Sequence, residues 1–373
     1  MMKGRGVFFL LNLFLVTMHG FAANVNVPAL ELYTHGSTEG GDFGFVSRGE
    51  LDLLVEGGYK FAGRVELNYF SPSLEEAATS GSLTFKSASI LLKEIFSLPL
   101  DFSYFIGENA TFCSGDLFPE TFGSLPFTTR YRGFLTFPQG VIYDGLHTLY
   151  GTGMKLDYSR QKELWLLSLF LYQDAKVDIP FEPGRYSLDF RGALNFSRLK
   201  LEAFLGATYP APGSTLGYLR AGLLFFAAEE GVEFLAQIGI PRWSPLEDSF
   251  SIDLFYLLFE PRVRLGLFSI IPTFFWRPSY YHQQVTEEQA FDVNLNLQIG
   301  RPPLTRVNGG LEGNFSYQIE SAGSAQSDFQ IKVSPYLQVE TSGVIWETKV
   351  NAKLWPFALD ELIEVFLAVK AEF

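Results

Sequence analysis

The feature that most constrains this chain is a strict alternation of apolar and polar residues, which returns in one long segment after another. In FDVNLNLQI (291–299) every odd-numbered residue is apolar and every even-numbered residue is Asp, Asn or Gln. The same pattern occurs in YKFAGRVELNYF (59–70), RYSLDFRGALNF (185–196), VNGGLEGNFSYQI (307–319), DFQIKVSPYLQVE (328–340) and VIWETKVNAKLW (344–355). Successive side chains of a β-strand point to opposite faces, so this period predicts strands with one apolar and one polar face.

The composition indicates what the apolar faces contact. Of the 373 residues, 47% are hydrophobic and 16% are aromatic, with 38 Phe and 17 Tyr. A membrane-spanning helix needs an apolar run of about 18 residues or more, but the longest candidate beyond the N-terminal region is LWLLSLFLY (164–172). This combination is typical of strands that turn one face to lipid and the other to a wet interior. A soluble secreted β-sandwich is the alternative fold, but it does not require an aromatic outer surface on every strand.

The N-terminal region has the pattern of a cleaved secretory signal. Lys3 and Arg5 precede the apolar run 7–16, and the small residues Gly20 and Ala22 follow at the spacing that a signal peptidase accepts. We therefore expect a signal peptide at 1–22. The formal net charge of the whole chain is -13, which argues against nucleic acid as a partner. The single cysteine, Cys113, excludes an internal disulfide in an oxidising compartment.

The remaining chain, 23–373, is expected to form one domain, an all-β transmembrane antiparallel β-barrel of about 14–18 strands, with 18 as the best count. About 9–11 tilted residues suffice for a strand to cross the hydrocarbon. Short connections are expected near 57–58, 197–198, 230, 261 and 342, alternating with longer, more polar ones. The expected strands are 28–35, 44–56, 59–70, 83–93, 99–107, 145–157, 163–174, 185–197, 199–209, 216–227, 231–240, 249–259, 262–276, 290–300, 306–319, 328–340, 343–355 and 362–373.

The last segment, ELIEVFLAVKAEF, resembles the C-terminal signal of bacterial outer-membrane proteins. That signal is a final amphipathic strand with a terminal Phe, matched here by Val365, Leu367, Val369 and Phe373, although Ala371 replaces the aromatic often found two positions before the end. The resemblance implies an outer-membrane location in a diderm bacterium and recognition by the barrel assembly machinery. An open apolar edge strand would be an aggregation hazard, whereas pairing with the first strand would close the sheet.

The longest connection, 108–144, is expected to be the third outer loop. Its segment FPETFGSLP (118–126) resembles the Pro-Glu-Phe-Gly turn of the general porin constriction loop, with Thr121 inserted. An ordinary aromatic surface loop is the alternative. The resemblance implies a constriction loop around Asp116, Glu120, Phe122 and Gly123, folded into the lumen. There its acids would face basic wall residues, for which Arg64, Arg185, Arg191 and Arg220 are the candidates, and set a field across the channel.

Some strands are apolar on both faces, which favours a second interpretation. If their alternates face lipid, Trp165, Leu167, Leu169 and Phe255 would face inward. Either a folded-in loop covers them, or part of the lumen carries a hydrophobic substrate. The latter suggests the long-chain fatty-acid transporter family, whose N-terminal hatch carries Asn-Pro-Ala; here only VPAL (27–30) is present, without that Asn.

The sequence does not indicate an enzyme. The histidines His19, His35, His147 and His282 have no Ser, Asp or Cys at a recognisable catalytic or metal-ligand spacing. We therefore expect no catalytic residue, metal or cofactor, and a channel for passive diffusion of small hydrophilic solutes. The fatty-acid transporter and a surface-exposed adhesin barrel are the alternatives. The expected partners are outer-membrane lipids, the assembly machinery and small solutes, and the sequence leaves homo-oligomerisation open.

Overall fold

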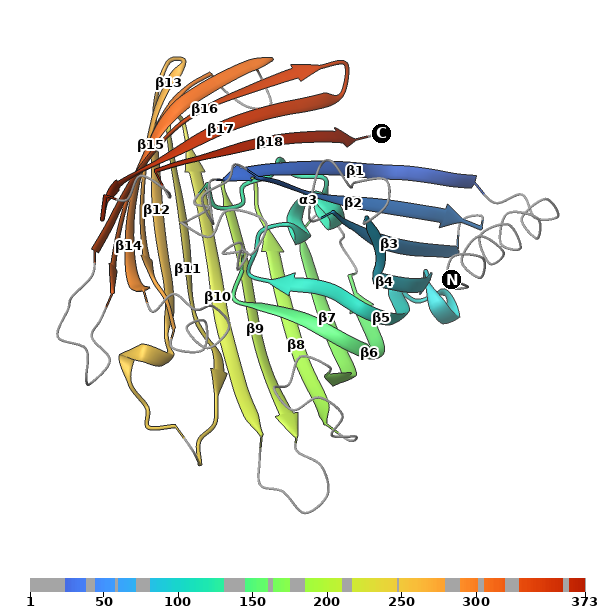
Figure 1. Ribbon diagram of the computed structural model, residues 1–373. Helices are drawn as coiled ribbons and strands as arrows, with labels where there is room; N and C mark the ends of the chain where they lie inside the picture. Colours follow the sequence, from blue (N-terminus) through green and yellow to red (C-terminus); the bar gives the residue numbers. More distant parts are fainter. Residues whose placement is uncertain are drawn as a thin grey trace, which may run out of the picture.

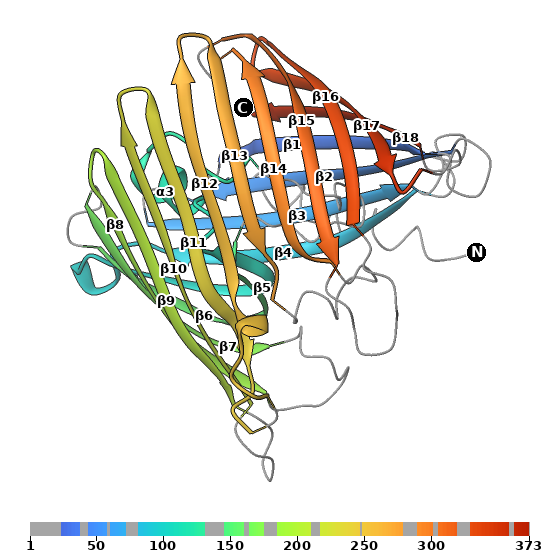
Figure 2. The ribbon, with the colours of Figure 1, turned by 90° about the vertical axis from the view of Figure 1, so that its left-hand side faces the viewer.

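The protein is a single closed β-barrel (Figures 1 and 2). The structure is a computed structural model that describes residues 24–37, 44–57, 60–71, 81–130, 145–159, 164–174, 185–209, 217–246, 248–278, 289–300, 305–318, 329–357 and 362–372. The expected signal peptide, 1–22, and the terminal Phe373 lie outside these residues.

The barrel contains 18 strands, which confirms the best count from the sequence. Their bounds are β1 Asn24–Ser37, β2 Gly44–Glu56, β3 Phe61–Ser71, β4 Ser82–Leu92, β5 Leu100–Phe112, β6 His147–Tyr158, β7 Trp165–Asp174, β8 Tyr186–Asn195, β9 Leu199–Tyr209, β10 Tyr218–Glu229, β11 Val232–Trp243, β12 Tyr256–Leu265, β13 Phe268–Trp276, β14 Gln289–Ile299, β15 Val307–Gln318, β16 Phe329–Thr341, β17 Val344–Trp355 and β18 Ile363–Glu372.

Each strand pairs antiparallel with its neighbours in sequence, and the first strand pairs with the last. The closing ladder between β1 and β18 sets Leu32 opposite Val369 and Gly36 opposite Val365. Closure leaves no free sheet edge, so the backbone N–H and C=O groups of every strand can pair with a neighbouring strand in lipid. The start of β1 and the end of β18 lie on the rim that carries the two-residue turns 230–231, 266–267 and 342–343.

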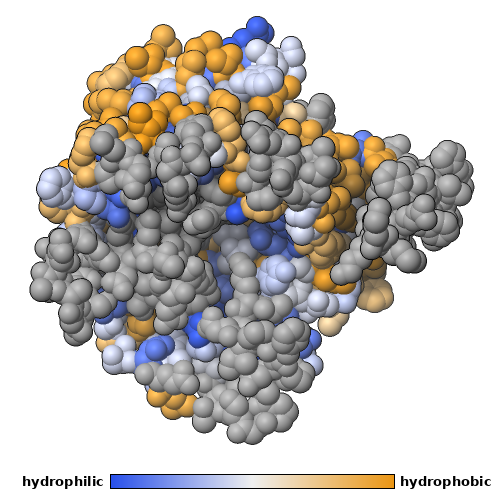
Figure 3. Space-filling view, in the orientation of Figure 1, coloured by the Kyte–Doolittle hydropathy of each residue, from blue (hydrophilic) through white to orange (hydrophobic). Residues whose placement is uncertain are grey.

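Along the strands, apolar side chains face outward and polar side chains face inward. In β8, Phe190 is 54% exposed on the outer face, whereas its neighbours Asp189 and Arg191 are 0% and 4% exposed on the inner face. Figure 3 shows the same division, with hydrophobic residues over the outside and hydrophilic residues gathered in the central recess. The outer surface is therefore suited to hydrocarbon, as the alternating pattern predicted.

The predicted boundary between β12 and β13 was wrong. We expected a turn near Pro261, but Pro261 lies within β12, opposite Phe234 of β11, and the turn comes at Gly266, whose φ is +68°. On its other side, the ladder to β13 is interrupted between Phe259 and Val263. A proline has no N–H to give to a sheet, so it is tolerated where the ladder is broken.

The predicted orientation of β7 was also wrong. Leu167 is 54% exposed to the outside, while Leu166, Ser168, Phe170 and Tyr172 are buried on the inner face. Phe255 is not in a strand at all: it follows the short helix η3 (Ile252–Leu254), and its ring packs edge-on against Phe250. Because both faces of β7 are apolar, its sequence pattern alone did not distinguish inside from outside.

Helices are few and short among the described residues. Besides η3, they are η2 (Ile95–Ser97) and α3 (Leu117–Phe122). None of the helices in the described ranges is long and apolar enough to cross a membrane. The helix α3 lies inside the barrel (Figure 1), in the long connection between β5 and β6.

Candidate constriction inside the barrel

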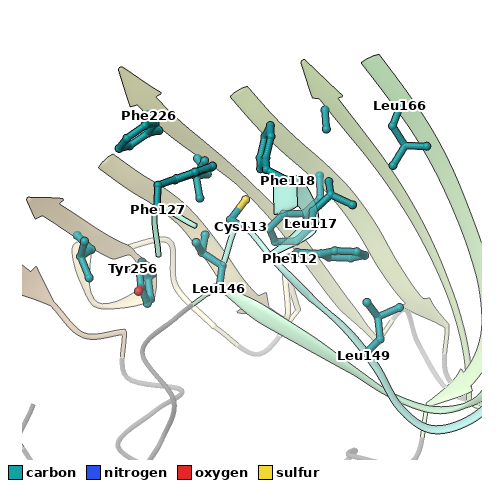
Figure 4. Close-up of a cluster of buried hydrophobic side chains, with 14 of the residues drawn as sticks. Phe112, Cys113, Leu117, Phe118, Phe127, Leu146, Leu149, Leu166, Phe226 and Tyr256 are labelled. Atoms are coloured by element: carbon teal, nitrogen blue, oxygen red, sulfur yellow. The ribbon is translucent and has the colours of Figure 1, made fainter. Parts of the chain in front are cut away.

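The connection between β5 and β6 folds into the barrel and packs against one part of its inner wall. Its described residues 113–130, here called the inner loop, contain α3 and contact strands β9 to β12. In the close-up of Figure 4, Cys113, Leu117, Phe118 and Phe127 point toward the strands that carry Phe226 and Tyr256. The chain therefore supplies its own cover for this side of the lumen.

Aromatic rings hold the inner loop against the wall. Phe127 stacks on Phe226 of β10 with ring centroids 4.3 Å apart, and Phe118 lies 5.0 Å from Phe127. At the start of the loop, Phe112 lies 4.9 Å from Phe204 of β9. Burying one such side chain contributes about 1.5–3 kcal/mol. The apolar inner residues of β7 to β13 therefore form a docking surface for the loop.

The first polar attachment of the inner loop lies at Cys113. Its backbone N–H donates to Glu202 Oε1 at 2.9 Å, and its carbonyl accepts from Gln237 Nε2 at 2.6 Å. Tyr256 Oη in turn donates to Gln237 Oε1 at 3.0 Å. Glu202 and Gln237 are nearly inaccessible to solvent, so these bonds replace water that Glu202 Oε1 and the Gln237 amide have lost, whereas Glu202 Oε2 is buried without a hydrogen-bond partner.

The second polar attachment lies at the other end of the inner loop, on β12. Glu260 accepts from Thr129 Oγ1 at 2.6 Å and from the Arg130 N–H at 3.0 Å, and Thr273 donates to it at 3.0 Å. Arg262 lies 2.7 Å from the same carboxylate and also donates to the carbonyl of Thr128 at 2.7 Å. Every partner of this buried carboxylate is a donor, so the ion pair is fully satisfied only while the loop is docked.

The thiol of Cys113 reports how closely the loop is packed. The side chain is fully buried. Burial raises the pKa of this thiol well above its ordinary value, and the negative charge of Glu202 adds to the shift. The group is therefore a neutral thiol and a poor nucleophile.

The helix α3 contains the first part, 118–122, of the segment that resembles the porin constriction loop. Pro119 lies in its first turn, and Gly123 ends it with a φ of +65°, donating its N–H to the carbonyls of Phe118 and Pro119. Among the sequence-predicted residues, Phe122 packs on Phe118 at 5.6 Å, whereas Asp116, Glu120 and Gly123 are exposed. One face of the helix is thus docked and the other faces open space.

Glu120 reaches the wall that the inner loop does not cover. Its carboxylate lies 3.8 Å from the guanidinium of Arg64 on β3. The same guanidinium contacts Asp52 of β2 at 2.8 Å and Glu66 of β3 at 3.1 Å. The structure therefore brings together two of the residues singled out from the sequence, Glu120 and Arg64, from opposite sides of the lumen.

The other three predicted arginines do not face α3 in this way. Arg220 is buried and paired with Asp189 at 2.6 Å, with further bonds to Thr208 and Tyr172. Arg191 is buried between the rings of Phe112 and Phe170, at 5.3 Å from each. Arg185 lies at the start of β8, where its carbonyl accepts from the N–H of Asp174. Arg191 and Arg220 sit on the side of the barrel that the inner loop covers. Sequence alternation could not reveal this, because it separates inward from outward residues but does not indicate which inward residues a loop covers.

Sequence reasoning missed the groups that anchor the loop. Glu202, Glu260 and Arg262 are inward charges in strands that are otherwise rich in apolar residues, as in LFEPRVRL (258–265). A charge pair at alternate positions of an apolar strand is the signal that could have identified them, because a buried charge requires a partner.

The uncovered part of the wall is polar. It carries ion pairs between neighbouring strands, among them Glu312 with Lys349 at 2.5 Å and Glu31 with Lys370 at 2.5 Å. Side-chain amides project from the same wall, including Asn296, which accepts from Tyr336 Oη at 3.0 Å. Such a surface interacts favourably with water and with hydrophilic solutes.

The described part of the chain contains no group of three or more His, Cys, Asp or Glu side chains able to hold a metal ion. His35 stacks on Phe366 with ring centroids 4.6 Å apart, and His147 lies beside Phe112 and Phe204. Both histidines thus contact aromatic rings. His19 and His282 lie outside the described residues.

The fold is similar to those of solved outer-membrane β-barrels. Neither a family model nor a curated protein matches the sequence. Among solved structures, the chain is similar to Wzi, an outer-membrane protein involved in group 1 capsule assembly in Escherichia coli and a carbohydrate-binding β-barrel. The identity is 11% and the TM-score 0.55, over 97% of this chain and 86% of that one. It is also similar to a variant of a porin from Rhodopseudomonas blastica, at 11% identity and a TM-score of 0.46, over 94% of this chain and 100% of that one.

The fold, with its apolar outer surface and polar interior, defines an outer-membrane β-barrel protein. The likeness to Wzi supports the architecture alone, because the identity is low. The residues that line the lumen of this protein determine what passes through or binds to the barrel.

Proposed function

We propose that the protein is a passive diffusion channel for small hydrophilic solutes. The observation that carries the proposal is the docked inner loop, which crosses the lumen and brings Glu120 to 3.8 Å from Arg64 on the far wall. A loop that only capped the barrel would not need two buried polar attachments, at Glu202 and at Glu260. The arrangement supports a narrowed passage with charged groups at its border.

In this mechanism, selection is by width and by charge, with no cofactor. The docked face of α3 fixes the position of the helix, and its exposed face presents Glu120 to the passage. Charges that line a narrow passage with low-dielectric walls act strongly on passing ions, because the field is concentrated there. Neutral solutes would be limited mainly by the width.

The packing weakens the case for a fatty-acid transporter. That alternative rested on strands that are apolar on both faces, for which Trp165, Leu167, Leu169 and Phe255 were expected to face inward. The structure instead turns other apolar residues inward, such as Phe170 of β7 and Phe275 of β13. In the structure these residues belong to the same buried cluster as Phe118 and Phe127 of the inner loop. The loop itself therefore accounts for the apolar wall.

Conductance of the purified protein in planar bilayers tests the proposal. We expect open channels, and a larger single-channel conductance in a variant that lacks residues 115–126. Removing residues 211–216 from another connection is the control, for which we expect unchanged conductance. Absence of channels would contradict the proposal, and binding of the protein to host surface proteins without conductance would favour the adhesin.

The proposed partners are outer-membrane lipids, the barrel assembly machinery and the solutes themselves. In β18 the apolar face includes Leu367, which is 50% exposed to the outside, and the strand closes the barrel on β1. We expect Phe373→Ser to reduce the yield of heat-modifiable barrel in outer membranes, because the last strand would be recognised less well. Normal assembly of this variant would count against the assembly signal.

A further inference from the structure

Carboxylates outnumber basic groups where α3 faces the wall. Lys86 of β4 lies 2.8 Å from Glu50 and 3.8 Å from Glu66, and Glu66 also contacts Arg64. With the contacts of Arg64 described above, the group has four carboxylates and two basic side chains, an excess of two negative charges. Its members, here called the α3-facing cluster, are Glu50, Asp52, Arg64, Glu66, Lys86 and Glu120.

Three ion pairs elsewhere on the uncovered wall each join one basic and one acidic side chain. Lys349 pairs with Glu312, Lys370 with Glu31, and Lys332 lies 3.7 Å from Glu364. Each of these pairs has one charge of each sign, so their fields largely cancel at a distance. The α3-facing cluster differs from these three pairs because its members carry a net negative charge.

Within the cluster, two of the four carboxylates, those of Glu120 and Glu50, are the side chains most exposed to a passing ion. The side chains of Glu120 and Glu50 are 63% and 47% exposed, compared with 42% for Arg64 and 20% for Lys86. On the same face of β3 as Arg64 and Glu66, the Oδ1 atom of Asn68 is buried without a hydrogen-bond donor. The partial negative charge of this oxygen has no protein donor opposite it, an observation independent of the ion pairs.

We infer that the passage beside α3 prefers cations over anions, and that Glu120 and Glu50 are its charge-selecting residues. The inference rests on the channel function proposed above and names the favoured solutes: small cations, such as alkali ions and protonated amines. Arg64 does not create an anion path, because Asp52, Glu66 and Glu120 surround its guanidinium. It holds the carboxylates at the border of the passage.

The test is the reversal potential of single channels in a KCl gradient, with full-length protein in planar bilayers of neutral lipid. The wild type should favour K⁺ over Cl⁻. One charge at about 4 Å in water is worth about 1 kcal/mol, so neutralising it should lower the permeability ratio about two- to fivefold. We expect this decrease in Glu120→Gln and in Glu50→Gln, and an increase in Arg64→Gln.

Glu229→Gln is the matched control. Glu229 is 62% exposed and pairs with Arg198 at 2.7 Å, but it lies at the rim with the short turns, remote from α3 along β10. Its permeability ratio should equal that of the wild type. Open channels that prefer Cl⁻, or an equal ratio in the wild type, Glu120→Gln and Glu50→Gln, would overturn the inference and leave the channel function standing. Absence of conductance would overturn both.

Discussion

The two sides of the lumen use inward-facing side chains in opposite ways. On the side of β7 to β13, aromatic rings and fully buried charges such as Glu202 and Glu260 bind the inner loop. On the side of β14 to β18 and β1 to β4, the ion pair of Glu31 with Lys370 is partly exposed, with side chains 18% and 40% accessible. The strands of both sides alternate in direction and have an apolar outer surface, so the difference lies in what covers the inner face.

Because of this difference, the covered side should contribute mainly to stability and the uncovered side mainly to the selectivity of transport. A buried carboxylate whose donors come from a loop makes the loop position depend on that one residue, because losing a partner leaves a charge uncompensated. An exposed pair contributes little to stability but presents its charge to anything that passes. Substitutions on the covered side should therefore move the loop, whereas substitutions on the uncovered side should change transport without unfolding.

The largest effect is expected for Glu260→Ala. This change leaves Arg262, Thr129 and the Arg130 N–H without their common acceptor, and breaking a buried pair costs about 3–5 kcal/mol. The free energy of unfolding in urea should fall by a comparable amount, and single-channel conductance should increase as the loop is released. Unchanged values of both quantities would show that the attachment is not required.

A somewhat smaller effect is expected for Phe118→Ala. Phe118 is fully buried against Phe127 and Phe122, and truncation of a buried Phe costs about 3 kcal/mol or more, less where the site can collapse. Leu125→Ala on the same loop is the control, because Leu125 is 70% exposed and surface changes usually stay within about 0.5 kcal/mol. Equal losses of unfolding free energy in the two variants would contradict the docked position of α3.

The smallest effect on stability is expected for Lys370→Met on the uncovered side. Its pair with Glu31 joins β18 to β1, but the lysine side chain is 40% exposed, and such pairs contribute about 1 kcal/mol or less. Urea unfolding should therefore match the wild type closely. A loss of unfolding free energy as large as that of Glu260→Ala would show that ion pairs on the uncovered side stabilise the protein as much as those on the covered side.

Much of the fold was predictable from sequence because alternation is a local property. The count of 18 strands and the bounds of segments such as β2 and β9 follow from the period of two and the turn residues. The segment around Pro261 was misread because a proline within a strand resembles a turn unless the interrupted ladder beside it is known.

The site was less predictable, because it depends on where a loop packs. The resemblance to the porin loop singled out Glu120 and the polar face of the strand 59–70 singled out Arg64, and the structure brings the two together. Nothing local distinguished Arg64 from Arg220, since both are inward and flanked by apolar residues; only the inner loop determines that Arg220 is covered and that Arg64 borders the passage. The anchors are also far from their partners in sequence: 89 residues separate Cys113 from Glu202, and 131 separate Thr129 from Glu260.

The docked inner loop is tested most directly by alkylation of Cys113, the single thiol of the chain. Cys113 is buried where the inner loop begins, against β9 and β11, and its raised pKa keeps it protonated, so a maleimide should not label the folded protein at pH 7 until urea unfolds it. In Glu260→Ala the labelling should become faster under native conditions. Rapid labelling of the folded wild type, at the rate of the unfolded chain, would contradict the account.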